Sequence, residues 1–402
     1  MQLEIPRHFQ PMVNQARQVA SSIFRPISRY YDAHEHKQPK ELDMLASILD
    51  GMNDGLGDTG AGAGRMSRGA NKDDTTVRNG NNMRTTLGLM ELCWGDVGLA
   101  LSLPRQGLGN AAIAAVANDE QLEKLNGCWA AMAITEPGAG SDSASIRTTA
   151  TADGDEYVIN GEKIYVTAGD RADVIVVWAT LDRSRGKAAI KSFYVKKGTP
   201  GMTVERLEKK LGIKASDTAA IRFDNCRVPK ENMLGDPDIK ADKGFAGAMQ
   251  TFDNTRPLVA GMAVGLGQAA LERTRELLSE AGVDLSHQYQ SWLQPAAVKE
   301  LHLLEAELEA ARLLTIKAAW MADNSQPNSR EASMAKAKAG RVCTRITLSC
   351  VSLCSSLGYG EKELLEKWAR DAKILDIFEG TQQIQLLIIA RRLLNKSSSE
   401  LR

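Results

Sequence analysis

Residues 376–385 read Asp-Ile-Phe-Glu-Gly-Thr-Gln-Gln-Ile-Gln and place a carboxylate, Glu379, between an aromatic residue and a glycine. Apolar residues recur at helical spacing before this stretch, from Leu364 to Ile377, and after it, from Ile384 to Leu394. The pattern predicts a break between two helices with Glu379 on it. Because apolar neighbours remove water from a carboxylate, we expect the pKa of Glu379 to rise towards the range of a general base. A solvated carboxylate or a helix cap is the alternative for a single glutamate at a helix end.

A second stretch, Thr135-Glu-Pro-Gly-Ala-Gly-Ser-Asp142, lies far upstream. Its two glycines and one proline form a turn whose N–H groups can face a ligand, although a plain surface turn has the same composition. Both stretches resemble signatures of the acyl-CoA dehydrogenase family. The resemblance continues in the family's order through Gly161 to Thr167, Ser216 to Thr218, Val228-Pro229, Phe252 to Pro257, Glu331 to Lys336 and Arg370 to Lys373. Each segment is modest alone, and from their joint order over residues 125–395 the chain is identified as a member of this family.

The composition is that of an ordinary globular protein. The chain has 402 residues, of which 43% are apolar and 25% charged, and this length allows two or three domains. With 50 acidic and 50 basic residues the formal net charge is zero, so we expect no nucleic-acid partner. The longest apolar runs, such as Val174 to Ala179, are too short to span a bilayer, so we expect no membrane partner.

Cysteine usage and the first residues bear on chemistry and compartment. The six cysteines contain no Cys-x-x-Cys pair, so we expect neither a metal site nor disulfides. The N-terminal sequence Met1-Gln-Leu-Glu-Ile-Pro lacks the charged-then-apolar plan of a secretory signal. A cytoplasmic location is therefore expected.

Three regions follow one another along the chain. Residues 1–130 are predicted to form an N-terminal helical domain, interrupted by a long glycine-rich loop over residues 51–83. No Gly-Lys-Ser/Thr follows these glycines, which favours a mobile or interface loop over a phosphate loop. Residues 131–238 are predicted to form a β domain and residues 239–402 a helical one. This order matches the fold that the resemblance implies: α+β, mainly α, with an N-terminal helical domain, a middle β domain and a C-terminal four-helix bundle.

Turn dipeptides and apolar runs give further detail. Asp153-Gly154 and Asn160-Gly161 are turn signals, and three runs are predicted as strands: Val174–Thr180, Ile190–Val195 and Ala220–Phe223. Further on, Gly265-Leu-Gly267 looks like part of a dinucleotide fingerprint. It follows no predicted strand, which favours close packing of helices instead.

The resemblance implies a reaction and a cofactor. The family desaturates an acyl-CoA thioester: a base removes the α-proton while hydride leaves the β-carbon for N5 of FAD. Glu379 matches the base in its commonest position in the family. Its backbone N–H and a ribityl hydroxyl of FAD are then expected to stabilise charge on the thioester oxygen. Gly380 lets backbone and ligand approach closely, or ends the helix, or does both.

The resemblance also assigns residues around the flavin and the substrate. The residues expected to contact FAD are Met132, Ile134, Thr135, Gly140, Ser141, Tyr165, Thr167, Thr381 and Gln383. The residues expected to contact acyl-CoA are Ser141, Asp253, Arg256 and Gly380. Tyr165 takes the place of an aromatic residue beside the flavin ring, and Thr167 that of a hydrogen-bond partner near N5. Without the resemblance both are ordinary strand residues, and Arg256 equally suits a structural ion pair with Asp253 or Asp224.

Two family elements that reach a neighbouring subunit's FAD are missing here. The family carries Arg followed by Phe-Gly after the first long C-terminal helix, whereas residues 279–290 read Ser-Glu-Ala-Gly-Val-Asp-Leu-Ser-His-Gln-Tyr-Gln. The family's Gln before a glycine-rich run is replaced by Cys354, and one glycine by Leu357. Loss of a cationic donor weakens the hold on a pyrophosphate. Either other residues compensate, with Arg341 and His287 as candidates, or the chain sits beside a different subunit.

Three functions remain in view. The leading one is an FAD-dependent acyl-CoA dehydrogenase that passes electrons to an electron-transfer flavoprotein and assembles as a homo-oligomer, either a dimer or a tetramer. An acyl-CoA oxidase shares the first half-reaction, but the 402-residue chain is short for that class. The third is one subunit of a hetero-oligomer with another acyl-CoA dehydrogenase-like subunit, with incomplete FAD binding on its own. Straight, branched and polycyclic acyl groups all fit these motifs.

Overall fold

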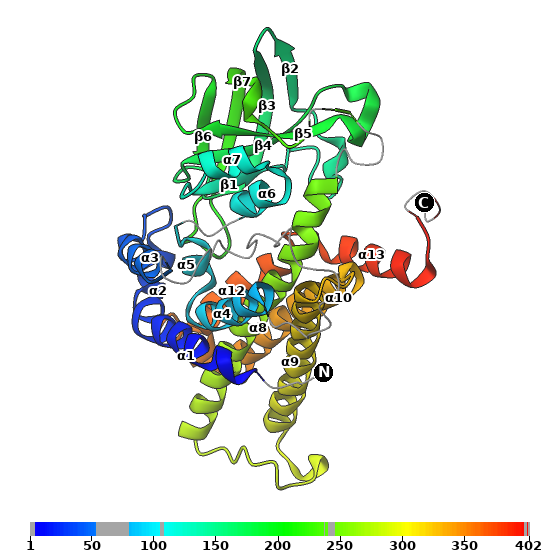
Figure 1. Ribbon diagram of the computed structural model, residues 1–402. Coiled ribbons are helices and arrows are strands. Elements are labelled where there is room, and N and C mark those ends of the chain that lie inside the picture. The colour runs from blue at the N-terminus through cyan, green and yellow to red at the C-terminus, as the bar shows by residue number, and fades with distance from the viewer. Residues whose placement is uncertain are drawn as a thin grey trace.

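The computed structural model describes residues 5–53, 80–104, 108–236, 238–239, 246–397 and 400. Helices come first, a β-sheet follows, and helices complete the chain (Figure 1). The sheet lies at one end of the molecule, while the first and last sets of helices pack together at the other. The predicted fold class, α+β and mainly α, is confirmed. Within the described ranges, no helix combines the length and the apolar character needed to cross a bilayer.

The first helices cover one side of the C-terminal helices and the base of the sheet (Figure 1). They are α1 (Gln10–Val19), a π-helical turn (Ala20–Phe24), α2 (Arg25–Ala33), α3 (Lys40–Asn53), α4 (Asn81–Gly95), α5 (Val97–Leu101), α6 (Leu108–Val116) and α7 (Asp119–Lys124). The long helix α8 (Ala246–Glu280) packs against α4. Its first turns lie near the sheet and its last turns lie in the helical part, so α8 connects the two (Figure 1).

The predicted glycine-rich loop over residues 51–83 is wrong at both ends, because the flanking helices extend into it. Helix α3 continues to Asn53 and α4 begins at Asn81. The rest of that prediction, residues 54–79, lies outside the described residues.

A distant carboxylate explains where α4 begins. Asp323, at the end of another helix, accepts hydrogen bonds from three backbone N–H groups, each at 2.9 Å: Gly80, Asn82 and Met83. The first N–H groups of a helix lack intrahelical partners, and a carboxylate there satisfies them and favours the helix dipole. Because Met83 and Asp323 are 240 residues apart, the local sequence does not show this cap.

The middle part is one sheet. Its strands are β1 (Ala130–Ala133), β2 (Thr149–Asp153), β3 (Glu156–Thr167), β4 (Val174–Thr180), β5 (Ile190–Lys196), β6 (Met202–Leu207), β7 (Thr218–Pro229) and β8 (Met233–Leu234). The strand order is β6-β7-β3-β2-β4-β5-β8, and β1 pairs with β4 in parallel. Every residue of β4 is buried, which is typical of a strand covered on both faces. Helix α6 packs on β1 and β4 and provides part of that cover.

The predicted strands are confirmed. β4 has the predicted bounds, β5 contains its predicted run, and β7 extends the predicted run Ala220–Phe223 in both directions. Asp153-Gly154 is a turn as predicted, because Asp153 pairs with Glu156 across it in the β2–β3 hairpin.

The prediction of a turn at Asn160-Gly161 is wrong. Both residues lie inside β3, at a bulge where its pairing with β7 changes register. A Cβ on Gly161 would lie 2.4 Å from Thr148 Oγ1, so this glycine permits a close approach rather than a reversal of the chain. The dipeptide composition alone does not distinguish the two uses.

Helices α8, α9 (Ala296–Asp323) and α10 (Ser329–Leu353) pack on one another as the centre of the C-terminal part. Three shorter helices follow, α11 (Ser355–Tyr359), α12 (Leu365–Ala372) and α13 (Gln382–Leu394), and all three contact α10. Gly265 and Gly267 serve helix packing, as predicted. A Cβ on Gly265 would lie 1.9 Å from the Met90 carbonyl oxygen of α4, which only glycine avoids.

A buried ionic cluster fixes α12 to the rest of the chain. Lys367 donates to Asp96 Oδ2 (2.6 Å) and to Asp371 Oδ2 (2.5 Å), and none of the three is more than 1% exposed. Ser28 of α2 donates its hydroxyl to Asp96, and the Ile213 N–H between β6 and β7 donates to Asp371 (2.5 Å). The cluster therefore holds α12, and the turn that follows it, against both the first helices and the sheet.

Candidate active site

The candidate base lies on a turn between two helices. Residues Lys373–Asp376 form a 3₁₀ turn after α12, and α13 begins at Gln382, so the predicted helix break is confirmed. Glu379 has a φ of +58° and Gly380 a φ of +93°, so two successive residues are left-handed. A non-glycine residue in this conformation is uncommon, and such strain is typical of functional sites.

The carboxylate of Glu379 faces α8 and α10. Thr255 Oγ1 donates to Glu379 Oε2 (2.9 Å), and the charges of Arg256 and Lys336 lie within electrostatic reach. Burial raises the pKa of Glu379, in the direction that the sequence predicts, while Thr255 and the two cations oppose the rise. A carboxylate with a raised pKa is a stronger base once it is ionised.

Arg256 lies at the site. Of the two acidic residues considered as its partners, Asp224 lies elsewhere, and the side chain of Asp253 is not described. Its side chain is 4% exposed on α8 and interacts with both Glu379 and Lys336. Asp224 lies on β7, where Asn225 donates to it (3.0 Å). The side chain of Asp253 lies outside the described residues. The structure therefore places Arg256 beside the candidate base, and its contact with acyl-CoA stays a prediction.

A buried ion pair anchors the loop over residues 135–141. Lys163 of β3 donates to Glu136 Oε1 (2.8 Å) and to the Ile134 carbonyl oxygen (3.1 Å). Glu136 also accepts from the backbone N–H of Thr148 (2.9 Å). Burial lowers the pKa of Lys163, and its contact with Glu136 opposes that shift. These contacts hold the acidic residue of the loop inside the sheet domain.

The glycines of the same loop face outward. A Cβ placed on Gly138 or Gly140 would meet no atom within 4 Å, and Ser141 is exposed. The loop is thus fixed at Glu136 and open at its glycines. Backbone N–H groups beside open space can approach a ligand closely.

Strand β3 brings Tyr165 and Thr167 alongside this loop. The Ile164 N–H donates to the Thr135 carbonyl oxygen (2.9 Å), and the β3–β7 register shifts between Lys163 and Val166. Within this bulge Tyr165 has a φ of +56° and is 62% exposed, while Thr167 is half-buried. A bulge re-aims the side chain that it carries. Here it presents a flat aromatic ring on the open side of the sheet domain.

The remaining predicted residues lie beside these two groups. Met132 is half-buried on β1, whereas Ile134 is 7% exposed and packs in a small core cluster. Thr381 caps α13, because its Oγ1 accepts from the Ile384 N–H (3.5 Å), and Gln383 is exposed in the first turn of that helix. The predicted residues whose side chains are described thus fall into two sets, one on β1, the 135–141 loop and β3, and the other at the Glu379 turn and on α8.

The sequence predicts no contact with this turn for Thr255, Lys336 or Gln385, although the first two lie in the family segments Phe252 to Pro257 and Glu331 to Lys336. Lys336 Nζ donates to the Gly380 carbonyl oxygen (2.7 Å), and Gln385 Nε2 donates to the carbonyl oxygens of Glu379 (3.0 Å) and Gly380 (3.0 Å). A signal exists for Lys336, because it is a lysine among alanines on the buried face of α10. Gln385 has no comparable signal, since glutamine is common in helices.

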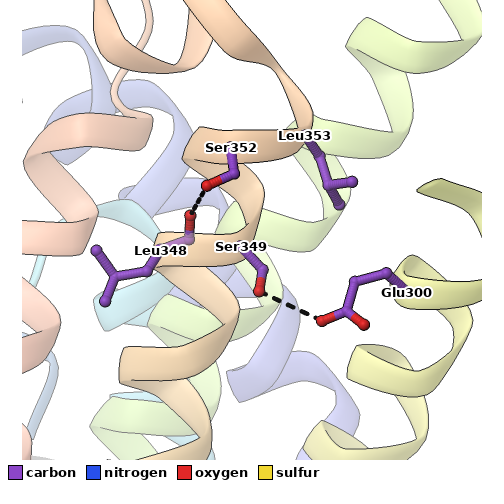
Figure 2. Close-up of a pocket in the computed structure, with 5 residues that line it drawn as sticks. All are labelled: Glu300, Leu348, Ser349, Ser352 and Leu353. Atoms are coloured by element: carbon purple, nitrogen blue, oxygen red, sulfur yellow. Dashed lines mark hydrogen bonds between the residues drawn. The ribbon is translucent and has the colours of Figure 1, made fainter. Parts of the chain in front are cut away.

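A pocket of about 320 Å³ lies elsewhere, between α9 and α10 (Figure 2). Its lining residues are Glu300, Leu348, Ser349, Ser352 and Leu353. Ser349 donates to Glu300 Oε1 (3.4 Å), so the polar groups of the pocket satisfy each other. Lys336 and Ser349 are 13 residues apart on α10, or roughly 20 Å at the helical rise per residue. The pocket therefore belongs to the flank of the helices and not to the Glu379 turn.

Three potential metal ligands, His287, His302 and Glu305, place their donor atoms within 4.8 Å of one another. The two imidazole rings stack at 3.9 Å with 24° between their planes, and Glu305 accepts from Arg275 (2.5 Å). The two rings already make a packing contact with each other, and the Glu305 carboxylate already has a cation in Arg275. We therefore assign the cluster to the packing of the loop before α9.

Comparison with known proteins places the chain in a family. The pattern described as acyl-CoA dehydrogenase, middle domain, matches residues 131–226, and the one described as acyl-CoA dehydrogenase, C-terminal domain, matches residues 242–394. The chain belongs to the acyl-CoA dehydrogenase family. The resemblance drawn from the two short stretches around Gly140 and Glu379 is thereby confirmed.

Individual relatives agree with this assignment. The mitochondrial short-chain specific acyl-CoA dehydrogenase of Mus musculus is 41% identical over 276 residues, which are 68% of this chain and 64% of the mouse protein. The match thus spans a little under two thirds of that relative. Butyryl-CoA dehydrogenase from Megasphaera elsdenii is 30% identical with a TM-score of 0.82, covering 98% of this chain and 100% of that one. A chain in a structure described as the electron transferring flavoprotein of Acidaminococcus fermentans is 28% identical with a TM-score of 0.80, covering 98% and 100%.

Members of the acyl-CoA dehydrogenase family are FAD-dependent flavoproteins, and the residues present here fit that cofactor. The open glycines of the 135–141 loop and the exposed ring of Tyr165 leave space for a flat group with polar edges. At the other set, the carboxamide oxygen of Gln382 is buried and has no hydrogen-bond partner among the described residues. A buried oxygen without a partner is costly, and a donor from a bound ligand would satisfy it.

Proposed function

We propose that this chain is an acyl-CoA dehydrogenase that removes the α-proton of an acyl-CoA thioester with Glu379, uses FAD, and passes electrons to an electron-transfer flavoprotein. The observation that carries the proposal is the turn itself. A carboxylate with a raised pKa stands on left-handed backbone and accepts a hydrogen bond from Thr255. A surface cap would need neither the strained backbone nor the desolvation.

The protein's own groups would hold and move the proton. Thr255 engages Oε2 of Glu379, which leaves Oε1 for the α-proton. Arg256 and Lys336 favour the ionised form, and burial strengthens it as a base. The Glu379 N–H would donate to the thioester oxygen, where charge develops as the proton leaves. Bound FAD supplies the acceptor for the hydride from the β-carbon.

The relatives support a substrate class and an electron acceptor. The mouse protein is named for short-chain acyl-CoA and the Megasphaera protein for butyryl-CoA, which supports a short acyl chain. The similarity to a chain in the Acidaminococcus structure supports an electron-transfer flavoprotein as the partner. An acyl-CoA oxidase is the alternative, since it differs only in how the flavin is reoxidised.

Absorbance of the flavin tests the proposal directly. Anaerobic addition of butyryl-CoA to the FAD-loaded protein should bleach the flavin, and electron-transfer flavoprotein should restore its colour faster than O2 does. Bleaching with fast reoxidation by O2 would indicate an oxidase. No bleaching by acyl-CoAs of any chain length, with FAD bound, would remove the proposed activity.

Thr255→Val should change the pH dependence of this reaction. The Thr255 hydroxyl stabilises the ionised carboxylate, so its loss raises the pKa of Glu379 further. Because the base works in its ionised form, the acidic limb of the pH profile for flavin reduction should move to higher pH. Thr274→Val, at a buried threonine further along α8, is the control and should leave the limb in place. An unmoved limb in Thr255→Val would contradict the contact.

A second candidate function is that of one subunit in a hetero-oligomer. It follows from the absence of the two family elements that contact the FAD of a neighbouring subunit. Cys354 stands where the family has a glutamine, and it is buried with its sulfur 3.8 Å from Thr274 Oγ1. A thiol has no amide group, and a buried one does not reach a neighbouring subunit. Leu357 stands for a glycine and is 46% exposed. This surface therefore lacks two of the groups with which the family holds the FAD of an identical subunit.

We expect the chain purified alone to bind less than one FAD per chain. Each lost charge-assisted hydrogen bond is worth roughly 1.5–3 kcal/mol, which is about tenfold or more in affinity. Flavin content after gel filtration, with and without a second acyl-CoA dehydrogenase-like subunit, measures this. The partner should raise the content towards one per chain. A stable yellow homotetramer with one FAD per chain would contradict the hetero-oligomer and show that identical subunits complete the FAD site.

A further inference from the structure

Two side chains from different helices hold the backbone of the Glu379 turn. Lys336 of α10 is fully buried, and its Nζ donates to the Gly380 carbonyl oxygen (2.7 Å). Gln385 of α13 is also fully buried, and its Nε2 donates to the carbonyl oxygens of Glu379 (3.0 Å) and Gly380 (3.0 Å). Both carbonyl oxygens of the left-handed pair are thus bound, and one of them is bound from two sides.

The left-handed backbone depends on such support. Gly380 accepts its positive φ readily, and it also makes room for Gln385, since a Cβ there would lie 2.4 Å from Gln385 Nε2. Glu379 carries a side chain and has no such freedom. Its conformation persists only when the surrounding groups determine it.

We infer that Lys336 is a positioning residue for Glu379: with Gln385 it clamps the carbonyl oxygens of the turn, and its charge favours the ionised base. The inference rests on the proposed function, in which Glu379 takes the α-proton. It adds to that function by giving Lys336 and Gln385 different roles at the turn. Gln385 supplies a neutral donor, whereas Lys336 supplies a donor and a charge to the same carbonyl oxygen.

The charges around Lys336 support this role. Burial lowers the pKa of Lys336 to about 8, Asp376 and Glu379 oppose the lowering, and Arg256 adds to it. The two carboxylates and the hydrogen bond to the Gly380 carbonyl oxygen favour the ammonium form. In return, Lys336 is one of the groups that lower the pKa of Glu379 against the effect of burial. A methionine would fill the same space without a buried charge, so packing alone does not explain a lysine here.

Matched substitutions separate the donor from the charge. Lys336→Met and Gln385→Met each remove one donor at nearly constant side-chain length, but only the first removes a charge. Lys336→Gln removes the charge and keeps a donor. Lys338→Met is the control, because Lys338 lies two residues further along α10 and pairs with Glu307 of α9 instead.

Amide hydrogen exchange of the full chain, followed over residues 376–385, reports the clamp without any catalytic step. We expect exchange about tenfold faster or more in Lys336→Met and Gln385→Met, because each loses a buried hydrogen bond that holds the turn. Lys336→Gln, whose donor lies one bond short of the lysine Nζ, should exchange more slowly than Lys336→Met, and Lys338→Met should exchange as slowly as the wild type. Wild-type exchange in Lys336→Met would overturn the clamp.

The pH profile of flavin reduction by acyl-CoA reports the charge. Loss of the cation disfavours ionised Glu379, so the acidic limb should move to higher pH in Lys336→Met and Lys336→Gln and stay in place in Gln385→Met. An unmoved limb in the lysine variants, or an equal shift in Gln385→Met, would overturn the electrostatic role. A failure of the proposed function gives a different result, because acyl-CoA would then still reduce the flavin of Glu379→Gln. Hydrogen exchange in the Lys336 and Gln385 variants would still show whether these side chains hold the turn.

Discussion

Glu379→Gln is expected to slow the reduction of bound flavin by acyl-CoA by about 10²–10⁴-fold, the usual effect of removing a general base. The amide keeps the shape of the carboxylate but cannot take the α-proton. Burial and the Thr255 hydrogen bond prepare the carboxylate for this step, and neither helps an amide to do it. Anaerobic rapid mixing with absorbance detection measures the rate.

Binding should survive in the same variant. An amide oxygen still accepts from Thr255, and Lys336 and Gln385 hold the turn through its backbone rather than through the Glu379 side chain. FAD content and acyl-CoA affinity should therefore stay near their wild-type values. Glu361→Gln, at an exposed glutamate before α12, is the control. Near-normal flavin reduction by Glu379→Gln would show that another group takes the proton.

Features that depend on neighbours in the chain could be predicted from the sequence. The apolar run of β4 and the Asp153-Gly154 turn are local, and the helix break at Glu379 follows from the residues around it. The turn predicted at Asn160-Gly161 is absent because a tertiary contact with Thr148, not the dipeptide, requires the glycine. The start of α4 differs from the predicted one for the same kind of reason, since its cap is the distant Asp323.

At the candidate site, too, local features could be predicted from the sequence and long-range contacts could not. Glu379 could be predicted because its apolar setting and the family segment both lie within ten residues of it. The role of Lys336 could not be predicted, because it depends on a hydrogen bond across 44 residues to Gly380. Thr255 acts across 124 residues. Such contacts are set by how α8 and α10 pack, and a helical pattern gives the face of a helix but not its partner.

The buried cluster of Lys367, Asp96 and Asp371 predicts the second large effect, on stability. Asp371 and Asp96 outweigh the cost of burial and hold the pKa of Lys367 above its usual range, so the lysine is charged in the folded protein. Lys367→Met leaves two buried carboxylates without their cation. Removing one partner of a buried ion pair typically costs about 3–5 kcal/mol. We expect a loss of that size in the free energy of unfolding, measured by urea denaturation.

The pH dependence of that loss separates electrostatics from packing. Burial already raises the pKa of Asp371, and without Lys367 it should rise further. The folded variant then binds a proton that the unfolded chain releases near the ordinary carboxyl pKa, so its stability falls as the pH rises towards neutral. The deficit relative to the wild type should therefore shrink under mildly acidic conditions. Lys373→Met, which removes an exposed lysine paired with Asp376 (3.3 Å), should change stability by about 0.5 kcal/mol or less at any of these pH values. A deficit in Lys367→Met that does not vary with pH would assign the effect to lost packing, and no deficit at all would show that the carboxylates do not need the cation.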